Sequence, residues 1–151
     1  ELASFSKQLL VTTEDGSMGR QGFVTTVLSE MMADPTSSPQ AVFAIGPVPM
    51  MRAVAELTRP QAIPTIVSLN PIMIDGTGMC GGCRLTVGGE TKFACVDGPD
   101  FDGHLVDFDD LMTRLRRYTK EERMALDHWE KEKGCRMQKS IDKAVDAAQS
   151  K

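Results

Sequence analysis

The first half of the chain alternates between short apolar runs and longer amphipathic segments. Continuous apolar, partly β-branched runs occupy residues 8–13, 41–45 and 65–69, a pattern typical of strands buried on both faces of a parallel sheet. Between them, residues 23–32 and 48–57 show helical spacing, and each segment ends shortly before a proline. The order strand, helix, strand, helix, strand predicts an α/β fold with a parallel sheet.

Three strands are fewer than the five or six of an average sheet. We therefore expect the chain to begin partway through a larger fold, and its first residue, Glu1, is not Met. The exposed sheet edge that such a truncation leaves could drive formation of a homodimer.

A second pattern begins after residue 72. Two short β-type runs, residues 85–87 and 91–94, are joined by Gly88-Gly89, which predicts a hairpin. Farther on, Asp107 is expected to cap a short helix that ends near residue 118, and Thr119 with Glu122 forms the sequence of a capping box for a second helix reaching about residue 149. The predicted domains are residues 1–72, 73–105 and 106–151.

Composition narrows the function classes. The 151 residues include 41% hydrophobic ones and carry a net charge of -4, which argues against non-specific nucleic-acid binding. No apolar run approaches the roughly 18 residues of a membrane span, and no charged-then-apolar leader begins the chain. We expect a cytoplasmic protein that contacts neither nucleic acid nor membrane.

The strongest chemical signal is a glycine-rich cysteine motif. Asp75, Cys80, Cys83 and Cys95 are separated by four, two and eleven residues. Plant-type 2Fe-2S sites have cysteines spaced by four and two residues and then a distant fourth, so the chain matches that pattern with a carboxylate in the first position. Glycines around the thiols permit positive φ angles and leave room for backbone N–H groups near sulfur. The motif predicts a 2Fe-2S cluster.

Other metal chemistry fits the same thiols. A structural zinc ion could bind the three cysteines together with Asp75 or His104, which would make the chain an interaction module without redox activity. A redox-active Cys80-x-x-Cys83 pair is a further alternative. Cys135 could be a fourth ligand, but its place in a charged helical pattern favours a surface or packing cysteine.

The loops after the first two predicted strands contain groups suited to a nicotinamide nucleotide, because parallel sheets bind ligands at the carboxyl ends of their strands. Acidic side chains in the first loop could accept hydrogen bonds from ribose hydroxyls, and backbone N–H groups there could donate to phosphate. In the second loop, a glycine and a proline before a helix would let the nicotinamide or its ribose lie against the backbone. The same sequences also fit an ordinary turn and a plain strand-to-helix junction. The candidate residues are Glu14, Asp15, Gly16, Ser17, Gly46 and Pro47.

Three stretches carry a family resemblance: AIGPVPMM, SLNPIMIDGTGMCGGC and FACVDGPDFDGHLVDFDDLM. They resemble the small subunit of NADH-dependent ferredoxin:NADP oxidoreductase, also called sulfide dehydrogenase. The chain is similar more broadly to the electron-transfer subunit of dihydroorotate dehydrogenase and to the diaphorase subunits of some hydrogenases. The resemblance extends from Leu9 to about Tyr118 and implies a partial ferredoxin-reductase-like sheet followed by a small cluster-binding domain.

The resemblance also implies cofactors and partners. Asp75 is expected to be the fourth cluster ligand, since the dihydroorotate branch has a cysteine at this position. Full-length members carry an FAD-binding barrel and a pyrophosphate loop that this sequence lacks, so FAD and tight NAD(P)H binding are not expected here. In such proteins a hydride passes from NAD(P)H to flavin, and single electrons then pass through the 2Fe-2S centre to a large flavin and iron-sulfur partner subunit, with ferredoxin as a further partner. The choice between NADH and NADPH stays open, because Glu14 and Asp15 favour a free 2′-hydroxyl whereas Arg20 could accept a 2′-phosphate.

Overall fold

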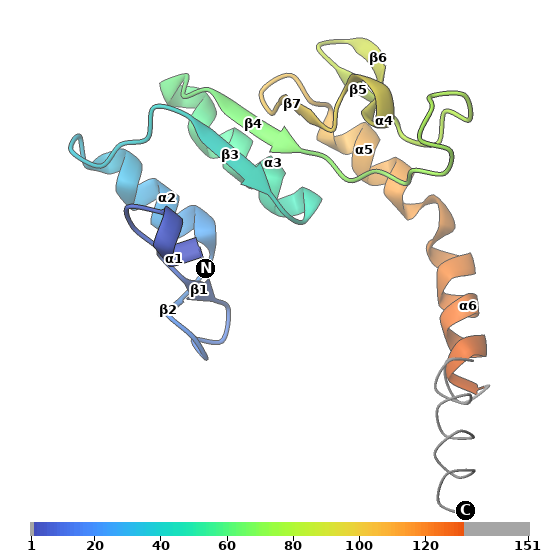
Figure 1. Ribbon diagram of the computed structural model, residues 1–151, viewed down its shortest axis with the longest axis horizontal. Coiled ribbons are helices and arrows are strands. Elements are labelled where there is room, and N and C mark those ends of the chain that lie inside the picture. Colours follow the sequence, from blue (N-terminus) through green and yellow to red (C-terminus); the bar gives the residue numbers. More distant parts are fainter. Residues whose placement is uncertain (1, 132–151) are drawn as a thin grey trace, which may run out of the picture. The chain divides into compact units, whose positions relative to one another are not determined.

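The computed structural model describes residues 2–131 (Figure 1). The chain forms two units, one ending at Met112 and one beginning at Thr113. These units do not test the predicted division into residues 1–72, 73–105 and 106–151, which stays a prediction. No helix within residues 2–131 is long and apolar enough to cross a membrane.

The first unit opens with short elements that differ from the prediction. Helix α1 spans Leu2–Phe5, and strand β1 is only Thr12–Thr13, which pairs in parallel with β2, Arg20–Gln21. The buried strand predicted at residues 8–13 is therefore wrong for residues 8–11, which are exposed and lie outside any strand. An apolar run forms a strand only where a neighbour supplies the hydrogen-bond ladder. For residues 8–11 the structure gives one such backbone hydrogen bond within the described part of the chain, from the Arg20 N–H to the Val11 carbonyl, at 2.9 Å.

The central layer follows the predicted order. Helix α2 spans Val24–Ala33, β3 spans Val42–Ile45, α3 spans Val48–Thr58 and β4 spans Thr65–Ser68, with a 3-10 turn, η1, at Arg59–Gln61 between the last two. Strands β3 and β4 pair in parallel. The predicted strands at residues 41–45 and 65–69 and both predicted helices are thus confirmed to within about a residue.

A third strand, β7 at Asp100–Asp102, completes a sheet in the order β3-β4-β7 and runs antiparallel to β4. The sheet is therefore mixed rather than wholly parallel. Ala44 and Val67 are neighbours in register and both are buried, as are Met51 and Ala55 on α3. On the opposite face of β3, Phe43 and other apolar side chains remain exposed.

The predicted hairpin is confirmed. Strand β5, Arg84–Val87, pairs antiparallel with β6, Glu90–Phe93, and the linking residues Gly88 and Gly89 have φ angles of 60° and 81°. Both angles favour glycine, as a two-residue hairpin turn requires. A one-turn helix, α4 at Ala94–Asp97, follows directly.

Helix α5, Phe108–Leu115, begins where the sequence predicts, since the Asp110 N–H donates to Asp107 Oδ1 at 2.9 Å. A 3-10 turn, η2 at Arg116–Tyr118, leads into α6, Thr119–Lys131. The predicted capping box at Thr119 is wrong: its backbone is already helical and its hydroxyl donates to the Arg116 carbonyl at 3.0 Å. The predicted continuation to residue 149, and Cys135 with it, lies outside the described residues.

Candidate metal centre and nucleotide cavity

The loop that carries the first predicted ligand is organised by that ligand's own carboxylate. Asp75 Oδ1 accepts the Thr77 N–H at 2.9 Å, and Asp75 Oδ2 accepts the Cys80 N–H at 2.7 Å. These hydrogen bonds, the one from Thr77 first, hold the pKa of Asp75 below its ordinary value. Gly76 and Gly78 have φ angles of 74° and 81°, so the turn between the two bonds needs residues without a Cβ.

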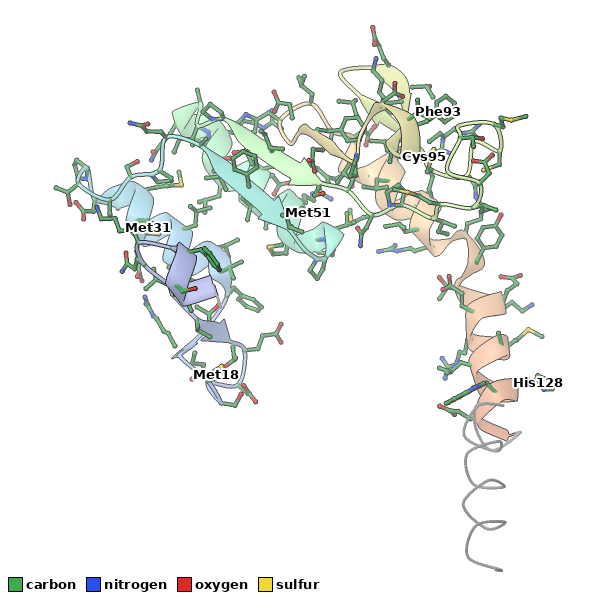
Figure 2. The ribbon with its side chains drawn as sticks, in the orientation of Figure 1. Met18, Met31, Met51, Phe93, Cys95 and His128 are labelled. Carbon is green, nitrogen blue, oxygen red and sulfur yellow. The ribbon has the colours of Figure 1, made fainter. Side chains whose placement is uncertain are left out.

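Two of the three predicted thiol ligands lie side by side. The Sγ atoms of Cys83 and Cys95 are 3.2 Å apart, and both cysteines are free thiols. Cys83 precedes β5 and is buried. Cys95, labelled in Figure 2, lies on α4 and is partly exposed. The Ala94 N–H donates to the Cys83 carbonyl at 3.2 Å, which ties the two ends of the hairpin together.

The Cys95 thiol is influenced by both neighbouring sulfur and neighbouring backbone. Its hydrogen bond with Cys83 and its burial raise the pKa of Cys95, while a hydrogen bond with the Gly78 backbone acts in the opposite direction.

The third thiol stands apart. Cys80 is exposed, and its Sγ accepts the Gly82 N–H at 3.4 Å. Among residues 2–131, no three His, Cys, Asp or Glu side chains converge as a metal ion would require. The structure thus brings Cys83 and Cys95 together and leaves Asp75 and Cys80 on the adjoining loop.

The donors present suit an iron-sulfur group. Three thiols and a carboxylate anion occur within 21 residues of sequence, and thiolate is the ligand that iron-sulfur clusters prefer. The Gly82 N–H already donates to a sulfur atom, that of Cys80, and such contacts tune a cluster once it is bound.

A cavity of about 540 Å³ lies beside the start of α2 and the start of α3. Neither helix has a side-chain hydrogen bond at its N-cap residue, Phe23 or Pro47. In α3, Pro49 has no N–H and the Met50 N–H donates to the Pro47 carbonyl at 2.9 Å, so α2 is the helix that offers more of its first-turn N–H groups to an anion. The cavity lining consists of Thr12, Glu14, Gly22, Phe23, Val24, Thr25, Pro47, Pro49, Met50 and Ala53.

Only two of the six predicted nucleotide residues, Glu14 and Pro47, line this cavity. Asp15 and Ser17 instead form a local turn, in which the Ser17 N–H donates to Asp15 Oδ1 at 3.0 Å and holds the pKa of Asp15 below its ordinary value. Gly16 lies within that turn with a φ of 73°, and Gly46 sits just before the lining residue Pro47. Sequence reasoning missed the aromatic and threonine lining, since nothing in the local pattern distinguishes it from core.

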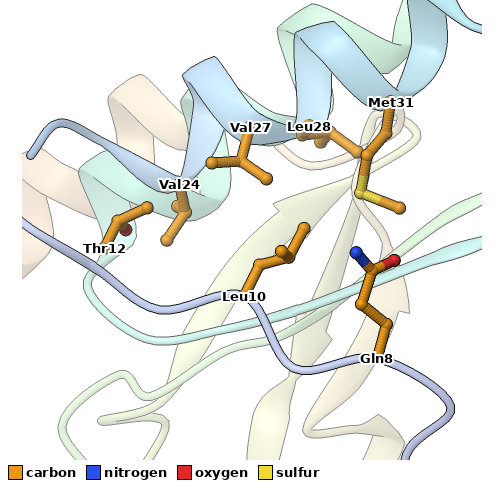
Figure 3. A pocket seen from close by; sticks show the side chains of 7 residues that line it. All are labelled: Gln8, Leu10, Thr12, Val24, Val27, Leu28 and Met31. Atoms are coloured by element: carbon orange, nitrogen blue, oxygen red, sulfur yellow. The ribbon is translucent and has the colours of Figure 1, made fainter. Parts of the chain in front are cut away.

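A smaller cavity of about 260 Å³ lies between residues 8–12 and α2. Figure 3 shows Leu10 pointing from the extended segment toward Val24, Val27 and Leu28. Thr12 and Val24 line both cavities, so the two adjoin.

Comparison with known proteins decides the nature of the cysteine region. Residues 70–107 match the model of the iron-sulfur cluster binding domain of dihydroorotate dehydrogenase B. The chain therefore contains an iron-sulfur domain of this family. This domain holds all four predicted ligands, the hairpin and β7, and its identity favours a cluster over the zinc alternative.

Longer relatives match beyond the iron-sulfur domain. An uncharacterized protein in the adh 3′ region of Clostridium beijerinckii is 54% identical over 76% of this chain and 38% of its own length. The dihydroorotate dehydrogenase B (NAD(+)) electron transfer subunit homolog of Thermotoga maritima is 44% identical over 83% of this chain and 44% of its own length. The family resemblance seen in the sequence is thereby confirmed.

A solved structure agrees with these relatives. A chain of NADH-dependent reduced ferredoxin-NADP oxidoreductase, described in connection with flavin-based electron bifurcation, matches with a TM-score of 0.73 and 43% identity. The match covers 83% of this chain and 45% of that one. The chain thus spans less than half the length of each of these three relatives, and shares with the solved chain a mixed α/β fold.

Proposed function

We propose that this chain is part of an electron-transfer subunit of an NAD(P)H-dependent oxidoreductase, and that its iron-sulfur domain holds a 2Fe-2S cluster through Asp75, Cys80, Cys83 and Cys95. The observation that carries the proposal is the Cys83–Cys95 thiol pair, with Sγ atoms 3.2 Å apart inside the matched segment. Two adjacent thiols with no disulfide between them can both bind the same metal ion.

The four ligands divide into two pairs in this proposal. Cys83 and Cys95 would hold one iron at the buried end of the hairpin, and Asp75 and Cys80 would hold the other on the exposed loop. The lowered pKa of Asp75 keeps its carboxylate anionic at neutral pH. Each of its oxygens has two lone pairs, so accepting one backbone N–H leaves one lone pair for iron.

A 2Fe-2S cluster, when bound, accepts and donates electrons one at a time. The chain's own contribution is to hold the ligands in place. Hydrogen bonds from Thr77 and Cys80 fix the Asp75 loop, and the hairpin fixes the pair formed by Cys83 and Cys95.

The cavity beside α2 and α3 supports a nicotinamide nucleotide as the electron source. The N-terminus of α2, which has no side-chain cap, favours the pyrophosphate, and Glu14 could accept a ribose hydroxyl. We propose that this cavity is half of the NAD(P)H site, and that FAD and the rest of the nucleotide site belong to the longer protein represented by the relatives.

The charge around Arg20 favours NADH in this proposal. Arg20 forms a two-contact ion pair with Glu30, whose Oε1 lies 2.6 Å from Arg20 Nη2. The cation that could have met a 2′-phosphate is therefore already neutralised, while Glu14 suits a free hydroxyl.

The remaining partners follow from the same proposal. Single electrons would leave through the iron-sulfur domain to a large flavin and iron-sulfur subunit, with ferredoxin as a further partner of the assembly. We place this assembly in the cytoplasm, because the three described cysteines are free thiols and a reducing compartment keeps thiols free.

Anaerobic purification followed by iron, sulfide and zinc analysis, visible absorption and EPR of the dithionite-reduced chain tests the proposal. We expect roughly two irons and two sulfides per chain, with an EPR signal that changes in Asp75→Ala and Asp75→Cys. Stoichiometric zinc and a colourless chain after anaerobic reconstitution would instead establish the structural zinc module.

A further inference from the structure

The cysteines of the iron-sulfur domain are paired in a way that their sequence spacing does not suggest. Cys80 and Cys83 are the closest in sequence, yet the thiol found in contact with that of Cys83 belongs to Cys95, with the two Sγ atoms 3.2 Å apart. Cys80 is exposed and its Sγ is engaged by the Gly82 N–H. The fold has therefore selected one thiol pair out of three possible pairs.

We propose that, when no cluster is bound, Cys83 and Cys95 close to a reversible disulfide in the presence of a low-molecular-weight disulfide such as oxidised glutathione. The sulfurs must approach from 3.2 Å to a bonded distance of about 2.0 Å. Side-chain rotation alone can supply a shift of this size, because the backbone already holds the two residues across the end of the hairpin through the Ala94 N–H to Cys83 carbonyl bond.

The exchange proceeds in two balanced steps. The Cys95 thiolate attacks one sulfur of oxidised glutathione, which breaks the S–S bond, forms a mixed disulfide on Cys95 and releases one glutathione thiolate. The Cys83 thiolate then attacks the Cys95 sulfur and expels the second glutathione. The two cysteines together lose two electrons and two protons, and the oxidant gains both as two thiols.

Burial dictates the order of these steps. Cys83 is only 2% exposed, whereas Cys95 is partly exposed, so a dissolved disulfide can reach Cys95 first. Cys83 then meets the mixed disulfide as its immediate neighbour, and this intramolecular step has a high effective concentration. Cys80, which is exposed and stands apart, has no such neighbour to displace glutathione and should retain it as a stable adduct.

The consequence for the cluster rests on the proposed function. A Cys83–Cys95 disulfide withdraws two of the three thiolate ligands, so the oxidised chain would accept iron and sulfide only after reduction. The same bond protects both sulfurs from irreversible over-oxidation. Cluster assembly would then depend on whether this thiol pair is reduced or oxidised.

The test uses the metal-free chain carrying Cys135→Ser, incubated with glutathione buffers of increasing oxidising strength and mapped by mass spectrometry after acid quench. We expect a Cys83–Cys95 cross-linked peptide and a single glutathione on Cys80. Adding Cys80→Ser should leave the cross-link unchanged, whereas Cys83→Ser should accumulate glutathione on Cys95. Circular dichroism of each variant confirms that it is folded.

A urea-unfolded sample provides the matched control, since loop-closure entropy there favours the shortest loop, Cys80–Cys83. A Cys80–Cys83 bond in the native chain, or separate glutathione adducts on all three cysteines, would overturn the inference and leave the 2Fe-2S proposal intact. A native Cys83–Cys95 bond that forms while the reduced chain never takes up iron and sulfide would support the disulfide but contradict the proposed function.

Discussion

The Nε2 atom of His104 lies 3.0 Å from the hydroxyl oxygen of Thr58. Thr58 is fully buried at the end of α3, and His104, considered from the sequence as a possible zinc ligand, is partly buried. Between them the Gly103 N–H donates to the Thr65 carbonyl at 2.7 Å, and a Cβ on Gly103 would lie 2.9 Å from the Val67 side chain. The iron-sulfur domain is thereby fastened to the central sheet at a point where no larger residue fits.

The Thr58 hydroxyl connects this junction to the core. It lies 2.6 Å from the Thr65 hydroxyl as well as near His104, so Thr58→Val leaves both neighbours with one partner fewer. We expect a loss of about 1–3 kcal/mol in the free energy of unfolding, measured by urea denaturation of the metal-free chain. Thr91→Val, at an exposed strand position, is the control and should change stability by no more than about 0.5 kcal/mol. Equal effects of the two variants would contradict the role of the Thr58 network.

The two kinds of thiol should differ in how far they tolerate replacement by serine. Cys83 is buried against Cys95, whereas Cys80 is exposed on the glycine-rich loop. We expect Cys80→Ser to retain a reconstituted cluster with an altered EPR signal, because a serine side chain at this exposed position can rotate to bring its oxygen to iron. Cys83→Ser should retain much less iron. Iron and sulfide analysis after gel filtration measures how much cluster each variant retains. Equal retention by both variants would argue against the division of the ligands into a buried pair and an exposed pair.

Local patterns were enough to predict some elements of this fold. The helical period identified α2 and α3, and Gly88-Gly89 located the hairpin turn, because those features depend on residues close together in sequence. Strand β7 was missed because only Phe101 of its three residues is apolar and buried, and its pairing with β4 is a long-range choice.

The candidate site residues show the same difference between what local sequence predicts and what long-range contacts decide. Cysteine spacing located the iron-sulfur domain, but only the fold reveals that Cys83 has Cys95 rather than Cys80 as its neighbour. Arg20 looked suited to phosphate until its pairing with Glu30, on another element, was visible. Thr58 and His104 are 46 positions apart in sequence, so a local sequence pattern cannot predict their contact.

The Asp75 loop should keep its two hydrogen bonds to a pH below the ordinary pKa of an aspartate. Because the pKa of Asp75 is lowered by the Thr77 and Cys80 N–H groups, their stabilising hydrogen bonds are fully present above the ordinary aspartate pKa of about 3.9. These hydrogen bonds are lost only as the pH falls through the lowered pKa that Asp75 has in the folded chain. Amide NMR shifts of Thr77 and Cys80 in the metal-free chain should therefore titrate together below pH 3.9 or so. Titration at the ordinary value, or amides unchanged in Asp75→Asn, would contradict the two hydrogen bonds.

The outer edge of β3 should promote self-association. Strand β3 has β4 on one side and, within the described residues, no strand on the other, and Ile45 on it is 76% exposed. Exposed apolar edge strands pair with copies of themselves. We expect a concentration-dependent dimer in sedimentation equilibrium that weakens in Ile45→Lys. Leu126→Lys, also at an exposed apolar site but on α6, is the control, and a dimer lost in that variant alone would place the contact elsewhere.

Release of Arg20 should shift nucleotide preference toward a 2′-phosphate. Glu30→Gln keeps the size of the side chain but removes the charge that neutralises Arg20, so a several-fold gain in affinity for 2′-phospho-AMP relative to AMP is expected. Saturation-transfer NMR measures the weak binding. Glu56→Gln is the control, because it also removes one negative charge but from α3, where Glu56 pairs with Arg52. An equal gain in affinity for 2′-phospho-AMP in this variant would mean a general effect of net charge. Adding Arg20→Gln to Glu30→Gln should abolish the gain, since the guanidinium is the group proposed to meet the phosphate. A gain that persists without Arg20 would assign phosphate recognition to the N-terminus of α2 beside the cavity.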